Sequence, residues 1–542
     1  MTVYTAVLDQ LSPFEFKDQL IALAASHAER AMLNAGRGNP NFLATTPRHA
    51  FFQLGVFAMG EAEQCAAGFP DGIAGMPSPD GIAARFEGFL QSRPDAPGIP
   101  FLAAALAYAR DCLDLAGDAF VHELVHAVLG CQYPEPVRML PCCERIVRQY
   151  LQKELLRDGL VAAIELFAVE GATAGISYVF NTLRANGLLA AGDTIAIGTP
   201  IFAPYLEIPR LCDYRLIELQ IAADAAAGWQ YPDSELGKLL NPRVKALLLV
   251  NPGNPTSVKV DRHGLAKIAD IVATSRPDLI IVTDDVYATF ADDFVSLFAL
   301  CPANTILLYS FSKYLGCTGW RLGVVATHPM NALDAQIATL PPQRLAKADG
   351  RYGTLVLDPR KLTFIDRLAA DSRAVALNHT AGLSTPQQVQ MALFALFGLM
   401  DRDNSYRNAV KRLIRGRHRA LWDALGVAAA EDPNATDYYA LLDFEALGAE
   451  LYGQDFAQWL RTTKNPTEIL LRLAEESGVV LLPGKGFATP HLSARVSLAN
   501  LGEADYVRIG RIVRALLSGY AEEYRVSRRD THVARARDES VA

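Results

Sequence analysis

The chain has 542 residues, of which 51% are hydrophobic and 20% are charged, and its 51 basic and 59 acidic side chains give a net charge of −8. This composition is that of a folded globular protein and excludes a disordered or fibrous one. The mild acidity argues against a nucleic-acid or anionic-membrane partner, since both favour a basic surface.

We expect neither a targeting segment nor a membrane segment in this sequence. Its first residues lack the basic stretch and apolar core of a secretory signal. A long uncharged stretch, 294–312, is interrupted by Pro302 and Asn304, so we expect two buried segments around a turn. The cysteines are scattered without a C-x-x-C pair, so neither a metal site nor a disulfide framework is expected. We therefore expect a cytoplasmic protein with reduced thiols.

The N-terminal part begins with an amphipathic stretch at 16–34, which ends in a Gly/Asn/Pro cluster typical of a loop. A Gly/Pro/Asp-rich region over 60–100 precedes a helix predicted over 101–128. From about residue 160, short apolar runs alternate with segments of helical periodicity such as 174–185 and 264–274. These runs predict buried parallel strands at 161–169, 193–198, 244–250, 279–283 and 305–309. Such alternation predicts an α/β fold, with a mostly parallel sheet between helices.

The C-terminal part has a different pattern. A helical region is predicted over 386–425, and strands at 438–444 and 494–498 flank a helix near 469–477. This mixture predicts a smaller α+β domain.

The most informative segment is 310–323, which contains Lys313. This lysine follows a predicted buried strand and lies among Ser and Gly residues. Burial lowers the pKa of a lysine and leaves a nucleophilic amine, which Schiff-base chemistry requires. Ser310 and Arg321 offer groups suited to a phosphate. Taken alone, a lysine in such a position is a solvated surface residue as often as a functional one.

Two further motifs follow neighbouring predicted strands. Asp284 ends one apolar strand and precedes Tyr287, and Asn254 lies in the segment 251–257 after another strand. Because the carboxyl ends of parallel strands meet at one edge, we expect these motifs and Lys313 to converge. Each motif alone is more often a turn, but three together favour a ligand site.

On these motifs the chain, from about Gly36 to Arg495, resembles the fold type I pyridoxal-phosphate enzymes of the aspartate aminotransferase superfamily. The resemblance implies pyridoxal 5′-phosphate as cofactor. Lys313 would form the Schiff base and carry protons. Asp284 would keep the pyridine nitrogen protonated, which strengthens the cofactor as an electron sink.

The same resemblance implies the rest of the binding site. Tyr287 and Asn254 would bond the ring 3′-oxygen, and Phe202 would stack on the ring. Arg495 would bind the substrate α-carboxylate, although an edge-strand arginine without these neighbours would be a surface residue. The phosphate would be held by Gly171, Ala172 (through its backbone only), Thr173, Ser310 and Arg321.

Three more stretches, 33–41, 130–140 and 379–388, resemble the aspartate 4-decarboxylases within this superfamily. That resemblance implies conversion of L-aspartate to L-alanine and CO2, with slow transamination as a side reaction. Arg37 would overhang the cofactor as a catalytic candidate, with Gly38 beside the substrate. Tyr133 would reach the phosphate of the neighbouring subunit. Thr380 would contact the substrate, but a turn hydroxyl explains it equally well.

Two alternatives remain open. One is an aspartate or aromatic aminotransferase with insertions. The other is a non-catalytic pyridoxal-phosphate-binding regulatory module, which would need a basic DNA-binding domain that the first 40 residues do not offer.

The resemblance also predicts the domains and the assembly. Residues 1–50 would pack with the small domain. Residues 51–405 would form the large cofactor-binding domain, with helical insertions near 60–160 and 330–375, and 406–525 the small domain. Residues 526–542 would be a flexible tail. Active sites shared across a dimer interface imply at least a homodimer, and the insertion after residue 60 predicts a larger homo-oligomer.

Overall fold

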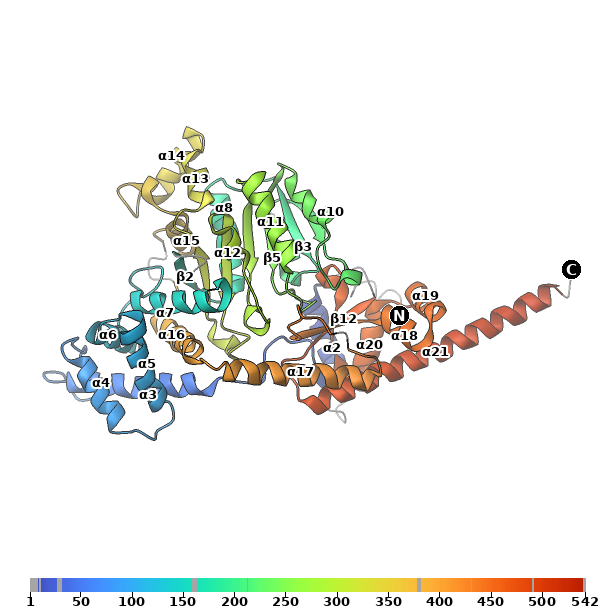
Figure 1. Ribbon diagram of the computed structural model, residues 1–542, viewed down its shortest axis with the longest axis horizontal. Helices are drawn as coiled ribbons and strands as arrows, with labels where there is room; N and C mark the ends of the chain where they lie inside the picture. The colour runs from blue at the N-terminus through green and yellow to red at the C-terminus, as the bar shows by residue number, and fades with distance from the viewer. Residues whose placement is uncertain are drawn as a thin grey trace.

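The computed structural model describes Leu8 and residues 11–26, 32–157, 163–211, 213–377, 382–429, 431–489 and 492–539, with side chains up to 529. A seven-stranded sheet forms the centre of the larger domain (Figure 1). Its strand order is β2 (Glu165–Val169), β8 (Gly323–Thr327), β7 (Thr305–Ser310), β6 (Ile280–Asp284), β5 (Val244–Val250), β3 (Thr194–Thr199) and β4 (Ile217–Ala222). Strand β8 is antiparallel to both neighbours and the other pairs are parallel, which confirms the predicted mostly parallel sheet.

Helices cover both faces of this sheet, as predicted. Alternate side chains of the central strands enter two separate apolar clusters, because successive side chains of a strand point to opposite faces. Helices α8 (Ala172–Ala185), α13 (Ala332–Ala338) and α15 (Phe364–Ser372) complete one cluster. Helices α11 (Arg262–Thr274) and α12 (Leu297–Leu300) complete the other. Two short helices, α9 (Ala203–Leu206) and α10 (Asp233–Leu236), lie in the connections.

Some predicted elements differ from the structure. The parallel strand predicted over 161–169 is instead a strand that begins at Glu165 and pairs antiparallel with β8. Residues 161 and 162 lie outside the described part of the chain. The single helix predicted over 101–128 is two helices, α5 (Ile99–Leu113) and α6 (Gly117–Leu129). They are separated because Asp114 adopts a left-handed backbone with φ of 50°.

The helical region predicted over 386–425 is also divided. Helix α16 (Thr385–Met400) ends before Asp401, and α17 (Ser405–Leu425) starts after Asn404, which has a left-handed backbone. The carboxylate of Asp401 accepts hydrogen bonds from backbone N–H groups in the first turn of α17. The break is therefore a capped turn, which helical periodicity does not reveal.

The small domain contains the antiparallel strands β11 (Leu482–Pro483), β12 (Ser493–Ser497) and β9 (Tyr439–Asp443). Its helices are α18 (Phe444–Tyr452), α19 (Gln454–Thr463) and α20 (Pro466–Ser477). The N-terminal helix α2 (Pro13–Ala25) packs on α20, and β1 (Leu33–Asn34) pairs in parallel with β10 (Val479–Val480). These contacts place the start of the chain beside the small domain.

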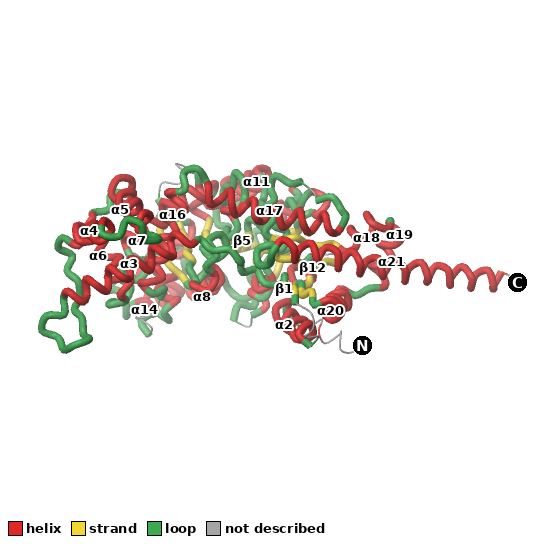
Figure 2. Tube along the Cα trace, turned by 90° about the horizontal axis from the view of Figure 1, so that it is seen from below, coloured by secondary structure: helices red, strands yellow, loops and turns green. Residues whose placement is uncertain are grey.

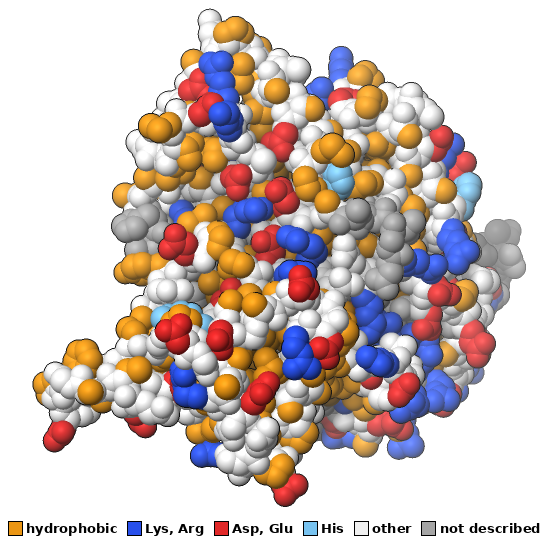
Figure 3. Space-filling view, turned by 60° about the vertical axis from the view of Figure 1, so that its left-hand side comes forward, with side chains coloured by type: hydrophobic (Ala, Val, Ile, Leu, Met, Phe, Trp, Pro, Cys, Tyr) orange, Lys and Arg blue, Asp and Glu red, His pale blue; other side chains and the backbone are white. Residues whose placement is uncertain are grey.

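Helices α3 (Thr45–Gln64), α4 (Ile82–Gln91), α5, α6 and α7 (Pro141–Leu151) form a layer at one end of the molecule, packed on α16 (Figure 1). A π-helical turn, Gln152–Leu156, follows α7. Large apolar side chains of this layer are exposed, among them Phe52, Met59 and Phe69. Figure 3 shows hydrophobic side chains among charged ones on this side of the molecule. Helix α14 (Pro342–Tyr352), in the second predicted insertion at 330–375, lies at the top of Figure 1.

The last helix, α21 (Glu503–Glu539), has 37 residues and a length of about 55 Å at 1.5 Å per residue. It packs along α17 and then extends beyond the rest of the protein (Figure 2). Within the described ranges, no helix is both long and apolar enough to cross a membrane.

Candidate active site

A cavity of about 270 Å³ lies at the edge where β5, β6 and β7 end. It brings together most of the residues that the sequence singled out. The predicted residues that line it are Gly38, Ala172, Thr173, Phe202, Asn254, Asp284, Tyr287, Ser310, Lys313, Arg321 and Arg495.

Asp284, the last residue of β6, is buried in the floor of this cavity. Its Oδ2 accepts a hydrogen bond of 2.7 Å from the Tyr205 hydroxyl, and its Oδ1 accepts one of 3.2 Å from the Val286 N–H. Burial raises the pKa of Asp284 to about 6, although these hydrogen bonds and the charge of Lys313 act in the opposite direction. A positive group beside this carboxylate would therefore be strongly favoured.

Lys313 lies just beyond the end of β7, and its Nζ donates a hydrogen bond of 3.2 Å to the Gly38 carbonyl. A Cβ on Gly38 would lie 2.4 Å from the Tyr439 hydroxyl and 3.3 Å from Lys313 Nζ. The N-terminal segment can thus approach the lysine this closely only because residue 38 has no side chain.

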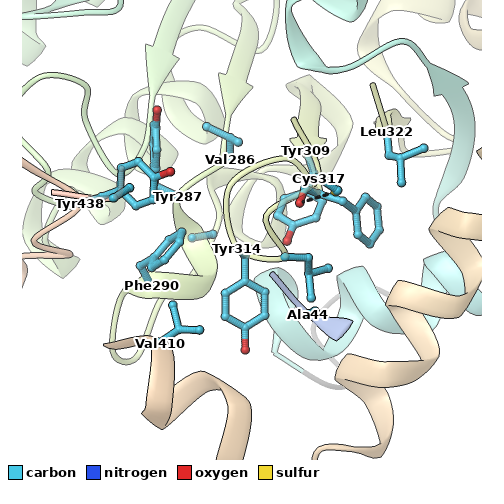
Figure 4. Close-up of a cluster of buried hydrophobic side chains, with 14 of the residues drawn as sticks. Ala44, Val286, Tyr287, Phe290, Tyr309, Tyr314, Cys317, Leu322, Val410 and Tyr438 are labelled. Carbon is cyan, nitrogen blue, oxygen red and sulfur yellow. Dashed lines mark hydrogen bonds between the residues drawn. The ribbon is translucent and has the colours of Figure 1, made fainter. Parts of the chain in front are cut away.

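Tyr287 and Tyr314, the residue after Lys313, belong to a buried aromatic cluster (Figure 4). The ring of Phe290 contacts those of Tyr438 and Tyr314, with centroids 4.9 Å and 5.7 Å away, and Tyr287 packs on Tyr438 at 5.1 Å. This dense packing fixes the backbone on which both functional side chains sit.

A second part of the cavity is suited to a phosphate. Gly171, with φ of 89°, precedes α8, whose first backbone N–H groups lack partners within the helix. The Arg321 guanidinium donates to the Glu170 and Thr318 carbonyls, and a Cβ on Gly171 would lie 2.6 Å from its Nη2. Ser310 is held by a 2.8 Å hydrogen bond to Ser312. Helix N-terminus, arginine and hydroxyls together make an anion site.

Arg495, in the middle of β12, is the cation at the opposite wall and is only 2% exposed. Its Nη1 donates to Asn254 Oδ1 at 3.0 Å, and its Nη2 donates to the Gly36 carbonyl at 2.8 Å. No carboxylate of the described residues pairs with it, so a carboxylate ligand would be its first charged partner.

The sequence reasoning missed several lining residues. Tyr205 lies three positions after Phe202 in the short helix α9, and that spacing was the available signal. Tyr439 is adjacent to Tyr438 in a strand that the sequence did predict. Phe14 comes from α2, and its ring lies 5.9 Å from that of Phe202. Only the tertiary fold brings Phe14 to the cavity.

Four predicted residues are not among those that line the cavity. Arg37 is exposed, next to the lining residue Gly38. Tyr133 is 68% exposed, so its side chain faces away from this subunit's core. Thr380 lies outside the described residues. Gly171 is not a lining residue itself but lies directly beneath Arg321.

The sequence model of the class I and II aminotransferases matches residues 140–510. The chain is also 53% identical to a bifunctional aspartate aminotransferase and L-aspartate β-decarboxylase of a Pseudomonas species, over 96% of this chain and 98% of that relative. The chain belongs to the class I and II aminotransferase family. An aspartate aminotransferase of Rhizobium meliloti is 29% identical, over 34% of this chain and 44% of the relative.

Solved structures of aminotransferases share the fold. The aspartate aminotransferase of Rhizobium meliloti matches with a TM-score of 0.60 at 17% identity, over 94% of this chain and 96% of that one. The aromatic aminotransferase of Pyrococcus horikoshii matches with a TM-score of 0.56 at 17% identity, over 93% and 99%. These matches confirm the predicted fold class.

Enzymes of this family use pyridoxal 5′-phosphate, and the site fits that group. The buried carboxylate of Asp284 suits a protonated ring nitrogen, and the anion site before α8 suits the phosphate. Lys313 supplies the amine for a Schiff base, and Phe202 is an aromatic ring in the cavity wall.

Proposed function

We propose that this enzyme converts L-aspartate to L-alanine and CO2 with pyridoxal 5′-phosphate, and transaminates aspartate slowly as a side reaction. The observation that carries this proposal is the 53% identity to the bifunctional relative over nearly the whole of both chains. That match extends into helices α3 to α6 of the N-terminal layer, which the aminotransferase family model, beginning at residue 140, does not cover.

The proposal assigns a role to each wall of the cavity. When bound, pyridoxal phosphate supplies an electron sink for charge that develops on the substrate. The Lys313 amine holds the cofactor and moves a proton to and from the substrate Cα. Asp284 keeps a proton on the ring nitrogen, with Tyr205 holding the carboxylate in place. Arg495 and Asn254 bind and orient the α-carboxylate.

The distribution of charge favours loss of the side-chain carboxylate. The lysines and arginines of the described residues that line the cavity are Lys313, Arg321 and Arg495. With Arg321 at the phosphate and Arg495 at the α-carboxylate, no further arginine among the described residues that line the cavity is left to clamp the side-chain carboxylate. A carboxylate that is desolvated and loosely held departs more easily as CO2, and a proton then replaces it on Cβ.

We further propose a cytoplasmic homodimer with shared sites that assembles into a larger homo-oligomer. The exposed positions of Tyr133 and of the apolar residues on α3 support a partner subunit at that end. Light scattering that shows a monodisperse dimer would contradict the larger assembly.

The decisive experiment mixes cofactor-loaded enzyme with L-aspartate and no keto acid, and follows CO2 and alanine together. We expect equimolar release over many turnovers. A single half-turnover to oxaloacetate, without sustained gas, would instead identify an aminotransferase. In that case the alternative function, an aspartate or aromatic aminotransferase with insertions, would replace the proposed one.

A further inference from the structure

The loop that carries Asn254 is bonded directly to the small domain. The Ser257 carbonyl accepts hydrogen bonds from the Thr436 N–H (2.7 Å) and hydroxyl (2.9 Å). Two residues later, the Lys259 N–H donates to the Asn434 carbonyl at 2.9 Å, and Val258 and Ala435 form an antiparallel bridge. This segment therefore joins the large-domain side of the cavity to the chain that enters β9.

Ser257 has an unusual backbone for its residue type. Its φ is 57°, in the left-handed region that favours glycine, and the residue is only 3% exposed. Its Oγ accepts a hydrogen bond of 2.7 Å from the backbone N–H of Tyr439, which is the first residue of β9. A strained, buried serine whose hydroxyl makes a defined contact points to a function for that hydroxyl.

Tyr439 connects Ser257 to two groups of the active site. Its hydroxyl lies 2.7 Å from that of Tyr287, and both tyrosines line the cavity. In the β9–β12 pair Arg495 stands opposite Leu441, so Tyr439, two residues away, projects from the same face. The Arg495 guanidinium accordingly lies over the Tyr439 ring, 4.2 Å from its centroid.

We propose that Ser257 is a positioning residue whose hydroxyl fixes the start of β9, so that Tyr439 holds the Tyr287 hydroxyl and the Arg495 guanidinium in place. The proposal deepens the proposed function and rests on it in one respect, that Arg495 binds a carboxylate of the substrate. Ser257 itself touches neither group; it acts through Tyr439.

A double-mutant cycle tests this role. The dissociation constant of succinate, a dicarboxylate without an amino group, is measured from the absorbance of the cofactor-loaded enzyme. Ser257→Gly relieves the backbone strain and removes the hydroxyl, and we expect it to raise the constant by about tenfold. Tyr439→Leu should raise it at least as much, and the double variant should bind succinate no more weakly than Tyr439→Leu alone.

Three further variants separate the hydroxyl from other effects. Ser257→Ala keeps the strain but lacks the hydroxyl, so its affinity should match that of Ser257→Gly. Tyr439→Phe keeps the ring over Arg495 and should retain succinate binding. It should nevertheless shift the pH midpoint of the cofactor absorbance, because Tyr287 loses its partner. Asp114→Gly, at an exposed left-handed position between α5 and α6, is the control for gaining a glycine and should change neither quantity.

Additive effects of Ser257→Gly and Tyr439→Leu would overturn the proposal, as would unchanged succinate affinity in Ser257→Gly or no succinate binding by the wild-type enzyme. The release of CO2 from aspartate is measured separately. If no CO2 is released but the effects of the two substitutions are not additive, the proposed decarboxylase activity is refuted and the positioning role of Ser257 stands. If CO2 is released normally but the effects are additive, the decarboxylase activity stands and the positioning role is refuted.

Discussion

The Tyr205 hydroxyl and the Asp284 carboxylate form a hydrogen bond of 2.7 Å in the floor of the cavity, and both residues are buried. Tyr205 donates, so the bond stabilises the ionised form of Asp284 and partly offsets the effect of burial on its pKa. The charge that faces the cofactor nitrogen therefore depends on a neighbour that itself belongs to the short helix α9.

Removing that donor should weaken cofactor binding. A hydrogen bond to a charged group contributes about 1.5 kcal/mol or more, so Tyr205→Phe should raise the dissociation constant of pyridoxal phosphate about tenfold. Equilibrium titration of the apoenzyme measures this. Tyr214→Phe, which removes a 2.7 Å bond to Asn181 outside the cavity, is the matched control. Equal affinities in Tyr205→Phe and wild type would contradict the role assigned to Tyr205.

Gly38→Ala should abolish most activity without unfolding the protein. The new methyl group would lie 2.4 Å from the Tyr439 hydroxyl and displace the segment above Lys313. We expect kcat to fall by about 100-fold, because misplacement by 1 Å has that order of effect. Gly237→Ala is the control, since a Cβ there meets nothing within 4 Å and its backbone is right-handed. Full activity of Gly38→Ala would show that this segment lies farther from Lys313.

Arg495→Lys should raise KM for aspartate by about 100-fold, because lysine cannot form the two parallel bonds that a guanidinium makes with a carboxylate. Steady-state kinetics at saturating cofactor provide the measurement. Arg276→Lys alters another buried arginine, one that bonds the Leu239 and Val244 carbonyls. It should lower the unfolding temperature and leave KM unchanged. If both variants change KM equally, Arg495 does not bind the substrate directly.

Asp285→Asn should change how the stability of the apoenzyme depends on pH. Asp285 is fully buried, and burial raises its pKa to about 7, with a hydrogen bond from Thr283 acting in the opposite direction. In the unfolded chain Asp285 loses its proton near pH 4. Its contribution to the free energy of unfolding is therefore fully present below that pH and is lost as the pH rises towards 7. The loss amounts to about 4 kcal/mol for a shift of about three pH units.

The asparagine variant lacks this titration. Its stability relative to wild type, measured by urea unfolding at fixed protein concentration, should therefore increase steadily from pH 4 to pH 7 and then level off. A constant difference across this range would mean that Asp285 has an ordinary pKa in the folded protein.

The sequence predicted those site residues that lie next to a segment with a clear pattern of its own. Lys313, Asp284 and Asn254 each lie at or just beyond the end of a strand with a strong apolar pattern, so their convergence could be predicted. For Tyr205 the spacing from Phe202 was the available signal, and Tyr439 gave no signal of its own, because a tyrosine in a helix or strand usually packs in a core. Phe14 reaches the cavity only through the packing of α2 on the small domain.

The same reasoning explains the errors in the fold. Strand β4, which was not among the predicted strands, is an edge strand with several exposed positions, so it lacks the continuous apolar run that identified β3, β5, β6 and β7. The breaks at Asp114 and at Asp401–Asn404 depend on left-handed residues and a carboxylate cap. Periodicity averages over such single positions and predicts one helix where there are two.

The parallel pairing of β1 with β10 has a mechanical consequence. The segment directly after β1 supplies the Gly36 and Gly38 carbonyls, which accept hydrogen bonds from Arg495 and Lys313. Since β1 is tied to the small domain, any rotation of that domain carries this segment and Arg495 together as one rigid body. In such a rotation, contact with the substrate carboxylate and covering of Lys313 would be one and the same movement, so the step that binds the substrate would also shield the reacting centre from water.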